Sequence, residues 1–191
     1  AFSTGIVVDT IMNKSTEANT EDSLGVSWGA SYDFGVTKPM ILVQYGKNEN
    51  KLGGFGVSDL YYFRDNMRNL TNEGLTGYGV TLGAITPLLG GNLYTSVSYT
   101  DGEFDGDATS QRLYGEKWVS STRVYDGDIQ RWGIAVGYDY PLSKRTKLYG
   151  FAAYNEGEIK GNQAGGNDGD PTSGKLEQTD IEAGVGLIHY F

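Results

Sequence analysis

The chain has 191 residues, a formal net charge of −9, 29 glycines, 14 tyrosines and no cysteine. The lack of cysteine excludes disulfides and thiolate metal sites, and the acidic charge argues against nucleic acid as a partner, because phosphate binding needs a basic face. A chain of this length corresponds to one domain, residues 1–191.

The mean hydropathy of the chain is low, at −0.39. Because the sequence also has no long apolar run, a transmembrane helix is excluded. A transmembrane β-barrel is not excluded, since each of its strands alternates between apolar and polar residues. The high tyrosine and glycine contents favour such a barrel, because aromatic side chains gather at membrane interfaces and glycine suits the inner face of a strand.

Apolar residues alternate with small or polar ones along about eight stretches, which is the pattern of β-strands. Leu24–Phe34 shows it most clearly, with large apolar residues at even positions and small or polar residues at odd positions. In chain order the predicted strands are Phe2–Met12, Leu24–Phe34, Lys38–Lys47, Thr76–Thr86, Asn92–Thr100, Gln130–Tyr140, Thr146–Tyr154 and Thr179–Phe191.

The connections between these strands alternate in length. Short turns are predicted at Gly35–Thr37, Pro87–Gly91 and Pro141–Arg145. Long acidic loops are predicted at Asn13–Ser23, Asn48–Leu75, Asp101–Ile129 and Asn155–Gln178. The apolar segment Asp59–Phe63 within them is predicted to be a short helix that packs on a neighbour, with a ligand site as the alternative. This layout is typical of outer-membrane barrels. We therefore predict an all-β fold, a transmembrane antiparallel up-and-down β-barrel in the outer membrane of a Gram-negative cell, with the C-terminus and the short turns periplasmic.

The predicted inward faces consist mostly of Gly, Ser, Thr and Ala. Such residues would not fill an eight-stranded barrel at protein packing density, but they suit a water-filled lumen of roughly sixteen strands. An open sheet edge in lipid is costly, so we expect an N-terminal barrel segment or a second polypeptide to complete the barrel. The alternative is a small barrel in which aromatic side chains pack over the glycines.

Several segments resemble Gram-negative general porins, and the ending resembles the neisserial and β-proteobacterial branch. These segments are Trp28-Gly-Ala-Ser-Tyr-Asp-Phe-Gly35, Val43-Gln-Tyr-Gly46, Tyr138-Asp-Tyr-Pro-Leu-Ser-Lys-Arg-Thr146, Leu148-Tyr149 and Gly184-Val-Gly-Leu-Ile-His-Tyr-Phe191. The resemblance maps the chain onto the C-terminal half of the family and implies a homotrimer of barrels with about sixteen strands each. In the family, the constriction loop and most of the facing arginines belong to the N-terminal half, and neither is found in this sequence.

Inward polar side chains are the candidates for a pore lining, because fixed charges tune the ion selectivity of a channel. The candidate set is Asp33, Gln44, Arg131, Asp139 and Glu182. Arg131 is expected to matter most, as the lone base among acids on the inward face, whereas Asp33 and Asp139 are expected near the periplasmic ends, in contact with water. The alternative is that each residue only solvates the wall.

Outward aromatic side chains are predicted to form the membrane girdles, with their rings in lipid and their polar tips among the headgroups. They are Trp28, Tyr32, Phe34, Trp132, Tyr138, Tyr140 and Phe191. The resemblance also implies that Phe191 is part of the signal for barrel insertion.

No catalytic constellation is found, because His189 is the single histidine and has no Cys or second His beside it. We therefore expect no enzyme activity and no cofactor. Asp-Gly-Asp occurs three times, and we interpret it as a turn motif. Its carboxylates, Asp105, Asp107, Asp126, Asp128, Asp168 and Asp170, are weak candidates for loop-bound Ca²⁺ or Mg²⁺.

The preferred hypothesis is a porin that passes small hydrophilic solutes and ions by passive diffusion, with lipid and lipopolysaccharide as its surroundings. The alternative hypothesis is a complete eight-stranded outer-membrane barrel with a structural or adhesion role through its acidic loops. A barrel enzyme is disfavoured by the single histidine.

Overall fold

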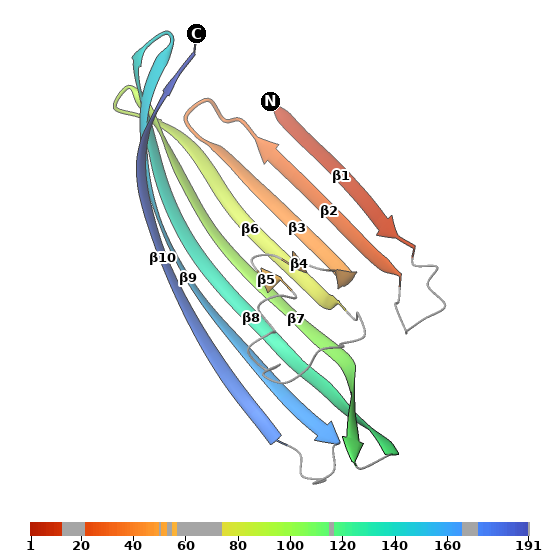
Figure 1. Cartoon of the computed structure of the whole chain (residues 1–191). Helices are drawn as coiled ribbons and strands as arrows, with labels where there is room; N and C mark the ends of the chain where they lie inside the picture. Colours follow the sequence, from red (N-terminus) through yellow and green to blue (C-terminus); the bar gives the residue numbers. More distant parts are fainter. Residues whose placement is uncertain are drawn as a thin grey trace.

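The structure, a computed structural model, describes residues 1–12, 22–49, 51–52, 55–56, 74–114, 117–165 and 172–190. In this part of the chain, eight antiparallel strands form one curved sheet in which neighbours follow the chain order (Figure 1). The strands of this sheet are β1 (Phe2–Ile11), β2 (Ser23–Tyr32), β3 (Lys38–Glu49), β6 (Leu75–Leu88), β7 (Gly91–Tyr114), β8 (Lys117–Ser143), β9 (Thr146–Gly165) and β10 (Thr172–His189). The short strands β4 (Lys51–Leu52) and β5 (Phe55–Gly56) pair separately with each other. The predicted all-β, up-and-down architecture is thus confirmed, and no described helix is long and apolar enough to cross a membrane.

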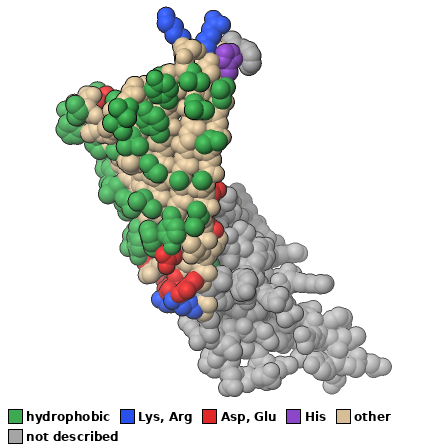
Figure 2. Space-filling view, turned by 90° about the vertical axis from the view of Figure 1, so that its left-hand side faces the viewer, with side chains coloured by type: hydrophobic (Ala, Val, Ile, Leu, Met, Phe, Trp, Pro, Cys, Tyr) green, Lys and Arg blue, Asp and Glu red, His purple; other side chains and the backbone are tan. Residues whose placement is uncertain are grey.

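The strand register collects the large apolar residues on one face of the sheet, called here the apolar face. One row of directly opposed residues on this face crosses the whole sheet. It consists of Thr4, Ala30, Ile41, Leu82, Val97, Ile134, Tyr154 and Ile181. Ile134 is 56% exposed and Ile181 is 77% exposed. The face is therefore apolar, and no other part of the described chain covers it (Figure 2). A continuous exposed apolar face of this kind suits contact with lipid.

The opposite face carries small and polar residues at corresponding positions. Its matching row consists of Ser3, Ser31, Met40, Gly83, Ser96, Ala135, Ala153 and Glu182. A single groove on this face is lined by residues from β1 to β10, so we call it the concave face. The alternation predicted from the sequence therefore assigns the two faces correctly.

The strands extend much further than predicted at the end of the sheet that carries the long loops. β7 and β8 stay paired from Asp101 opposite Gln130 to Tyr114 opposite Lys117, and β9 and β10 stay paired to Gln163 opposite Thr172. The predicted loops Asp101–Ile129 and Asn155–Gln178 are therefore wrong for most of their length. The backbone ladder continues here, although the sequence of these extensions has no regular alternation of apolar and polar residues to mark it.

The opposite end of the sheet carries three short turns, as predicted, although their bounds differ. The turn between β6 and β7 consists of Leu89 and Gly90, with φ of 49° and 85°. Positive φ at both central residues matches the right-handed twist of a two-residue hairpin. Pro87 and Pro141 were predicted in turns but lie at strand ends, where a missing N–H is tolerated.

The sheet is open in the described structure. β1 lies at one edge beside β2, and β10 lies at the other edge beside β9, with no pairing between the two edges. A closed eight-stranded barrel is thus not what these residues form. The number of strands in the complete barrel stays a prediction.

A small apolar cluster lies against the concave face at the long-loop end. It consists of Leu52, Leu75, Phe104, Ile129 and Ile159, each at most 8% exposed. Leu52 belongs to the segment after β3 and packs where three neighbouring strands carry glycine. Its methyl carbons lie 2.8–3.3 Å from the positions that a Cβ on Gly46, Gly77 or Gly102 would take. The chain after β3 therefore begins by turning onto the concave side of the sheet.

Candidate functional site

The short-turn end of the concave face holds a carboxylate with three donors. Asp139 accepts hydrogen bonds from Asn92 Nδ2 at 3.0 Å, Tyr94 Oη at 3.0 Å and Lys147 Nζ at 3.1 Å. Asp139 is 7% exposed, and a buried carboxylate is stable when it is paired and hydrogen-bonded. The expectation that Asp139 meets water is therefore wrong. The sequence did contain a clue to this ion pair, because Lys147 follows Asp139 by eight residues, on the other strand of the predicted hairpin.

Arg131 lies on the concave face, next to the predicted girdle residue Trp132, and reaches a carboxylate two strands away. Its Nη2 is 3.2 Å from Oδ2 of Asp180 on β10, and the two side chains are 19% and 38% exposed. The residue opposite Arg131 on the intervening strand is Gly157, which has no side chain to block this approach. The prediction that Arg131 is the lone base of this face is wrong, because Lys38 and Lys147 line the groove nearer the short turns on the same face.

The other predicted pore-lining residues do not join these two clusters. Gln44 shares a row with Arg131, through Gly79 and Thr100, and donates to Ser27 Oγ at 3.4 Å. Glu182 is exposed on the concave face. Asp33 was predicted within a strand but lies beyond the end of β2, where its carboxylate accepts the N–H of Gly35 at 2.7 Å. Asp33 is therefore a turn residue, since an Asp oxygen that bonds the N–H two residues on stabilises such a turn.

Apolar side chains cover part of the concave face that was predicted to be small and polar. Met40, Leu42, Tyr94, Phe151 and Ile188 are each 36–45% exposed there. The prediction of inward faces built mostly from small residues is thus wrong towards the short turns. The signal was present at the odd positions of Thr146–Tyr154, which carry large side chains.

Aromatic residues on the apolar face form two belts. Trp28, Tyr99 and Trp132 lie in one row, linked through Val43 and Val80. Trp28 donates its indole N–H to Thr4 Oγ1 at 3.0 Å, and the ring of Trp132 lies 5.3 Å from that of Tyr154.

The second belt lies near the short turns. Tyr138 donates its hydroxyl to the carbonyl of Leu88 at 2.8 Å, Tyr140 is exposed, and Tyr32 packs on Phe34 with ring centroids 4.5 Å apart. Phe34 itself lies in the turn after β2, and Phe191 lies outside the described residues. From Trp132 to Tyr140 the strand rises about 26 Å, which at the tilt of about 35–45° in outer-membrane barrels spans about 20 Å of the apolar band of about 25 Å.

The family of Gram-negative porins matches residues 1–160 of the sequence. The chain belongs to this family. Membership supports an outer-membrane location for this porin. No curated protein matches the sequence. Among solved structures, a major outer membrane protein from Thermus thermophilus is similar at 12% identity and a TM-score of 0.33, with 100% of each chain covered.

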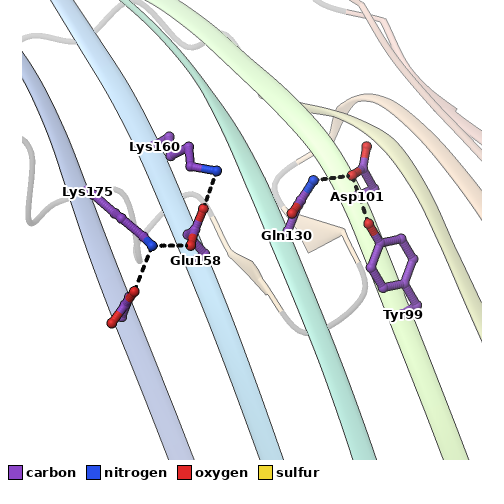
Figure 3. Close-up of polar contacts among 7 residues, drawn as sticks. Tyr99, Asp101, Gln130, Glu158, Lys160 and Lys175 are labelled. Atoms are coloured by element: carbon purple, nitrogen blue, oxygen red, sulfur yellow. Dashed lines mark hydrogen bonds and ion pairs between the residues drawn. The ribbon is translucent and has the colours of Figure 1, made fainter.

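The apolar face of the porin ends in charged residues beyond the row of Trp132. Figure 3 shows the polar contacts among these residues. Glu158 forms ion pairs with Lys160 and with Lys175, the latter at 2.6 Å, and Lys175 also pairs with Glu177 at 2.7 Å. The neighbouring strands continue this charged cluster, since Asp101 accepts Gln130 Nε2 at 2.9 Å and Tyr99 Oη at 3.1 Å.

The pKa values in this cluster follow from its contacts. Hydrogen bonds from Lys160 and Lys175 lower the pKa of Glu158, and those to Glu158 and Glu177 raise the pKa of Lys175. Glu158 and Lys175 therefore stay charged over a wide pH range. Because charged side chains avoid lipid, this cluster lies where the apolar surface ends.

The described side chains include no group of three or more His, Cys, Asp or Glu arranged for a metal ion. Two Asp-Gly-Asp motifs were interpreted as turns but lie in β7 and β8, with Asp105 opposite Asp126 and Glu103 opposite Asp128. The side chains of Asp105 and Asp107, and the whole motif of Asp168 and Asp170, lie outside the described part, as does the predicted helix Asp59–Phe63.

His189 lies on the apolar face near the short turns. Its Nδ1 is 2.8 Å from Thr146 Oγ1, and its register partner on β9 is the same Thr146. This contact holds the ring beside β9 at the rim of the sheet.

Proposed function

We propose that this porin forms a water-filled channel for the passive diffusion of small hydrophilic solutes and ions, with the concave face as its inner wall. The observation that carries the proposal is the division of the sheet into two faces. An apolar face is framed by aromatic belts and ends in charged residues, whereas the concave face carries Arg131, Asp180, Gln44 and Glu182. This arrangement fits lipid on one side and water on the other.

Further strands must complete such a channel. The outer edges of β1 and β10 have no partner strand in the described structure, and each unpaired N–H or C=O facing hydrocarbon costs several kcal/mol. We infer that an N-terminal barrel segment or a second polypeptide pairs with both edges. This fits the expectation that the chain is the C-terminal half of a barrel with about sixteen strands.

The orientation and assembly are part of the same proposal. The short turns and the C-terminus face the periplasm, and the long polar strand pairs β7–β8 and β9–β10 face outside, near lipopolysaccharide. Three barrels associate, as in the family that the sequence resembles. The chain supplies no cofactor-dependent or catalytic step in this proposal.

Conductance in a planar bilayer tests the channel. Purified native complex should give stable current steps in groups of three, with a conductance that rises in proportion to salt concentration, as expected of a water-filled pore. The mass of the same native complex should exceed a multiple of this chain by the mass of the completing segment. Silent bilayers from correctly folded complex would refute the channel and favour the structural or adhesion role.

A further inference from the structure

A gap between two aromatic rings lies on the concave face near the short turns. The register places Tyr94, Gly137 and Phe151 side by side on β7, β8 and β9. Gly137 therefore has a ring-bearing neighbour on each side and no side chain of its own. We call the space above Gly137 the ring slot.

The contacts of the two rings leave the ring slot open. Phe151 leans away from it, because the ring edge lies 2.6 Å from the position of a Cβ on Gly184. Tyr94 is drawn towards the short turns by its hydrogen bond to Asp139. A Cβ built on Gly137 meets no atom nearer than 3.5 Å, so the floor of the slot is accessible.

The width of the ring slot matches a planar ring. Adjacent strands lie about 4.8 Å apart, so a ring above Gly137 would be about 4.8 Å from each flanking strand. A Cβ on Gly137 would lie 3.6 Å from Cβ of Phe151 and 3.7 Å from Cβ of Tyr94. A third ring can thus lie above Gly137, between the bases of these two outward-leaning side chains.

The groove that contains the ring slot carries a net positive charge in an acidic chain. Its charged lining residues are Lys38, Asp139 and Lys147. Asp139 and Lys147 neutralise each other at 3.1 Å, whereas no ion pair among the described residues involves Lys38. The groove therefore favours an anion, although the whole chain has a net charge of −9.

Lys38 lies in the same row as the ring slot. The row runs from Lys38 through Ile85 and Tyr94 to Gly137, which is three strand spacings, or about 14 Å. A lysine side chain spans about 6 Å of this distance. The remaining 8 Å or so fits a ring, a two-carbon chain and a carboxylate that ends in a hydrogen bond of about 2.8 Å.

We propose that the ring slot and Lys38 bind solutes in which a planar aromatic ring is joined by a short chain to a carboxylate. The inference rests on the proposed function, because the concave face must line a channel that solutes enter. Tyr94 would pack against the chain of the solute and Ile85 against the side chain of Lys38, while Tyr94 and Phe151 would flank the solute's ring. The porin would then retain aromatic acids in preference to other small solutes.

Calorimetry with the purified native complex tests the site, with 3-phenylpropionate as the probe. Gly137→Val fills the slot, Phe151→Leu removes one ring but keeps its apolar bulk, and Lys38→Gln removes the charge. Each should raise the dissociation constant about fivefold, the size of one lost aromatic or ionic contact. The control Gly29→Val adds the same side chain elsewhere on the concave face, where a Cβ meets no atom nearer than 3.6 Å, and should bind as the wild type does.

Two further probes separate the parts of the site. Butyrate, which lacks the ring, and 3-phenylpropan-1-ol, which lacks the charge, should both bind about fivefold more weakly than 3-phenylpropionate. Equal affinities for the three probes, or unchanged affinity in all three site variants, would overturn the proposal. Conductance is measured separately. A porin that conducts ions but binds the three probes equally would refute this site alone, whereas a porin that does not conduct would refute the channel.

Discussion

Arg131 on β8 reaches across β9 and pairs with Asp180 on β10, with 3.2 Å between Nη2 and Oδ2. The two residues are not register partners, and the pair forms because Gly157 stands opposite Arg131 on the strand between them. Both side chains retain contact with solvent, at 19% and 38% exposure. A fixed dipole of this kind on the concave face would act on ions that pass along it.

Reversing the charge of Arg131 should shift the channel towards cations. Arg131→Glu changes the local charge by two units and places a second carboxylate beside Asp180, which attracts cations to the inner wall. The measurement is the reversal potential across a tenfold KCl gradient. Lys160→Glu makes the same charge change on the charged cluster of the apolar face and serves as the matched control. An equal shift in both variants would contradict the inner-wall position of Arg131.

Removing the charge of Asp139 should destabilise the short-turn end of the sheet. Asp139→Asn keeps the shape but deprives Lys147 of its counter-ion and weakens the bonds from Asn92 and Tyr94. Hydrogen bonds to a charged group contribute about 1.5–3 kcal/mol each, so we expect a loss of about 2 kcal/mol in the free energy of unfolding. Urea unfolding in detergent micelles measures it.

The control for this prediction is an exposed carboxylate in a turn. Asp33→Asn removes the same charge where the carboxylate contacts the N–H of its own turn, and it should cost under about 1 kcal/mol. If Asp139→Asn lowered the free energy of unfolding no more than Asp33→Asn does, the three hydrogen bonds to Asp139 would contribute nothing to stability.

The ion pairs of Glu158 should make stability depend on pH. Because the folded pKa of Glu158 lies below its ordinary value of 4.5, its contribution is complete above pH 4.5 and is lost as the pH falls through the folded pKa. Because the folded pKa of Lys175 lies above 10.5, its contribution is complete below pH 10.5 and is lost as the pH rises through the folded pKa. The stabilising window therefore lies between these two limits.

The test of this window compares thermal unfolding of the wild type and Glu158→Gln as a function of pH. The variant should be less stable at neutral pH, and the difference should begin to shrink below pH 4.5 and vanish once the pH is below the folded pKa of Glu158. Glu182→Gln, on the concave face, serves as the matched control without a described ion pair. A difference that stays constant down to the acid limit would show that the ion pairs carry none of this pH dependence.

Alternation of residue type was sufficient to predict the membrane-crossing part of the fold. At Leu24–Phe34 and Gln130–Tyr140 the apolar positions are strictly periodic, and the register places them on one face. The extensions of β7 to β10 escaped prediction because their sequence lacks the alternation of apolar and polar residues on which strand prediction depends. Backbone hydrogen bonds between these strands do not require alternating apolar residues, so the strands continue without that pattern.

The candidate site was harder to predict than the fold. The inner wall was assigned to the correct face, but partners such as Asp180 for Arg131 lie two strands away and depend on the register. The ring slot depends on three strands that meet at Gly137. Both contacts depend on the register of the strands and on the glycines that lie between the side chains. The sequence alone does not give the register.

Shortening Leu52 should loosen the segment that leaves β3. Leu52 is 3% exposed and packs against the glycines of β3, β6 and β7. Leu→Ala in a packed site costs about 2–5 kcal/mol, because the cavity left behind collapses only in part. We expect Leu52→Ala to lower the free energy of unfolding by about 2 kcal/mol, or, if this segment unfolds separately, to speed its cleavage by protease by about tenfold or more. Leu89→Ala, at an 85% exposed turn position, should change neither quantity, and equal behaviour of the two variants would mean that Leu52 does not hold its segment against the sheet.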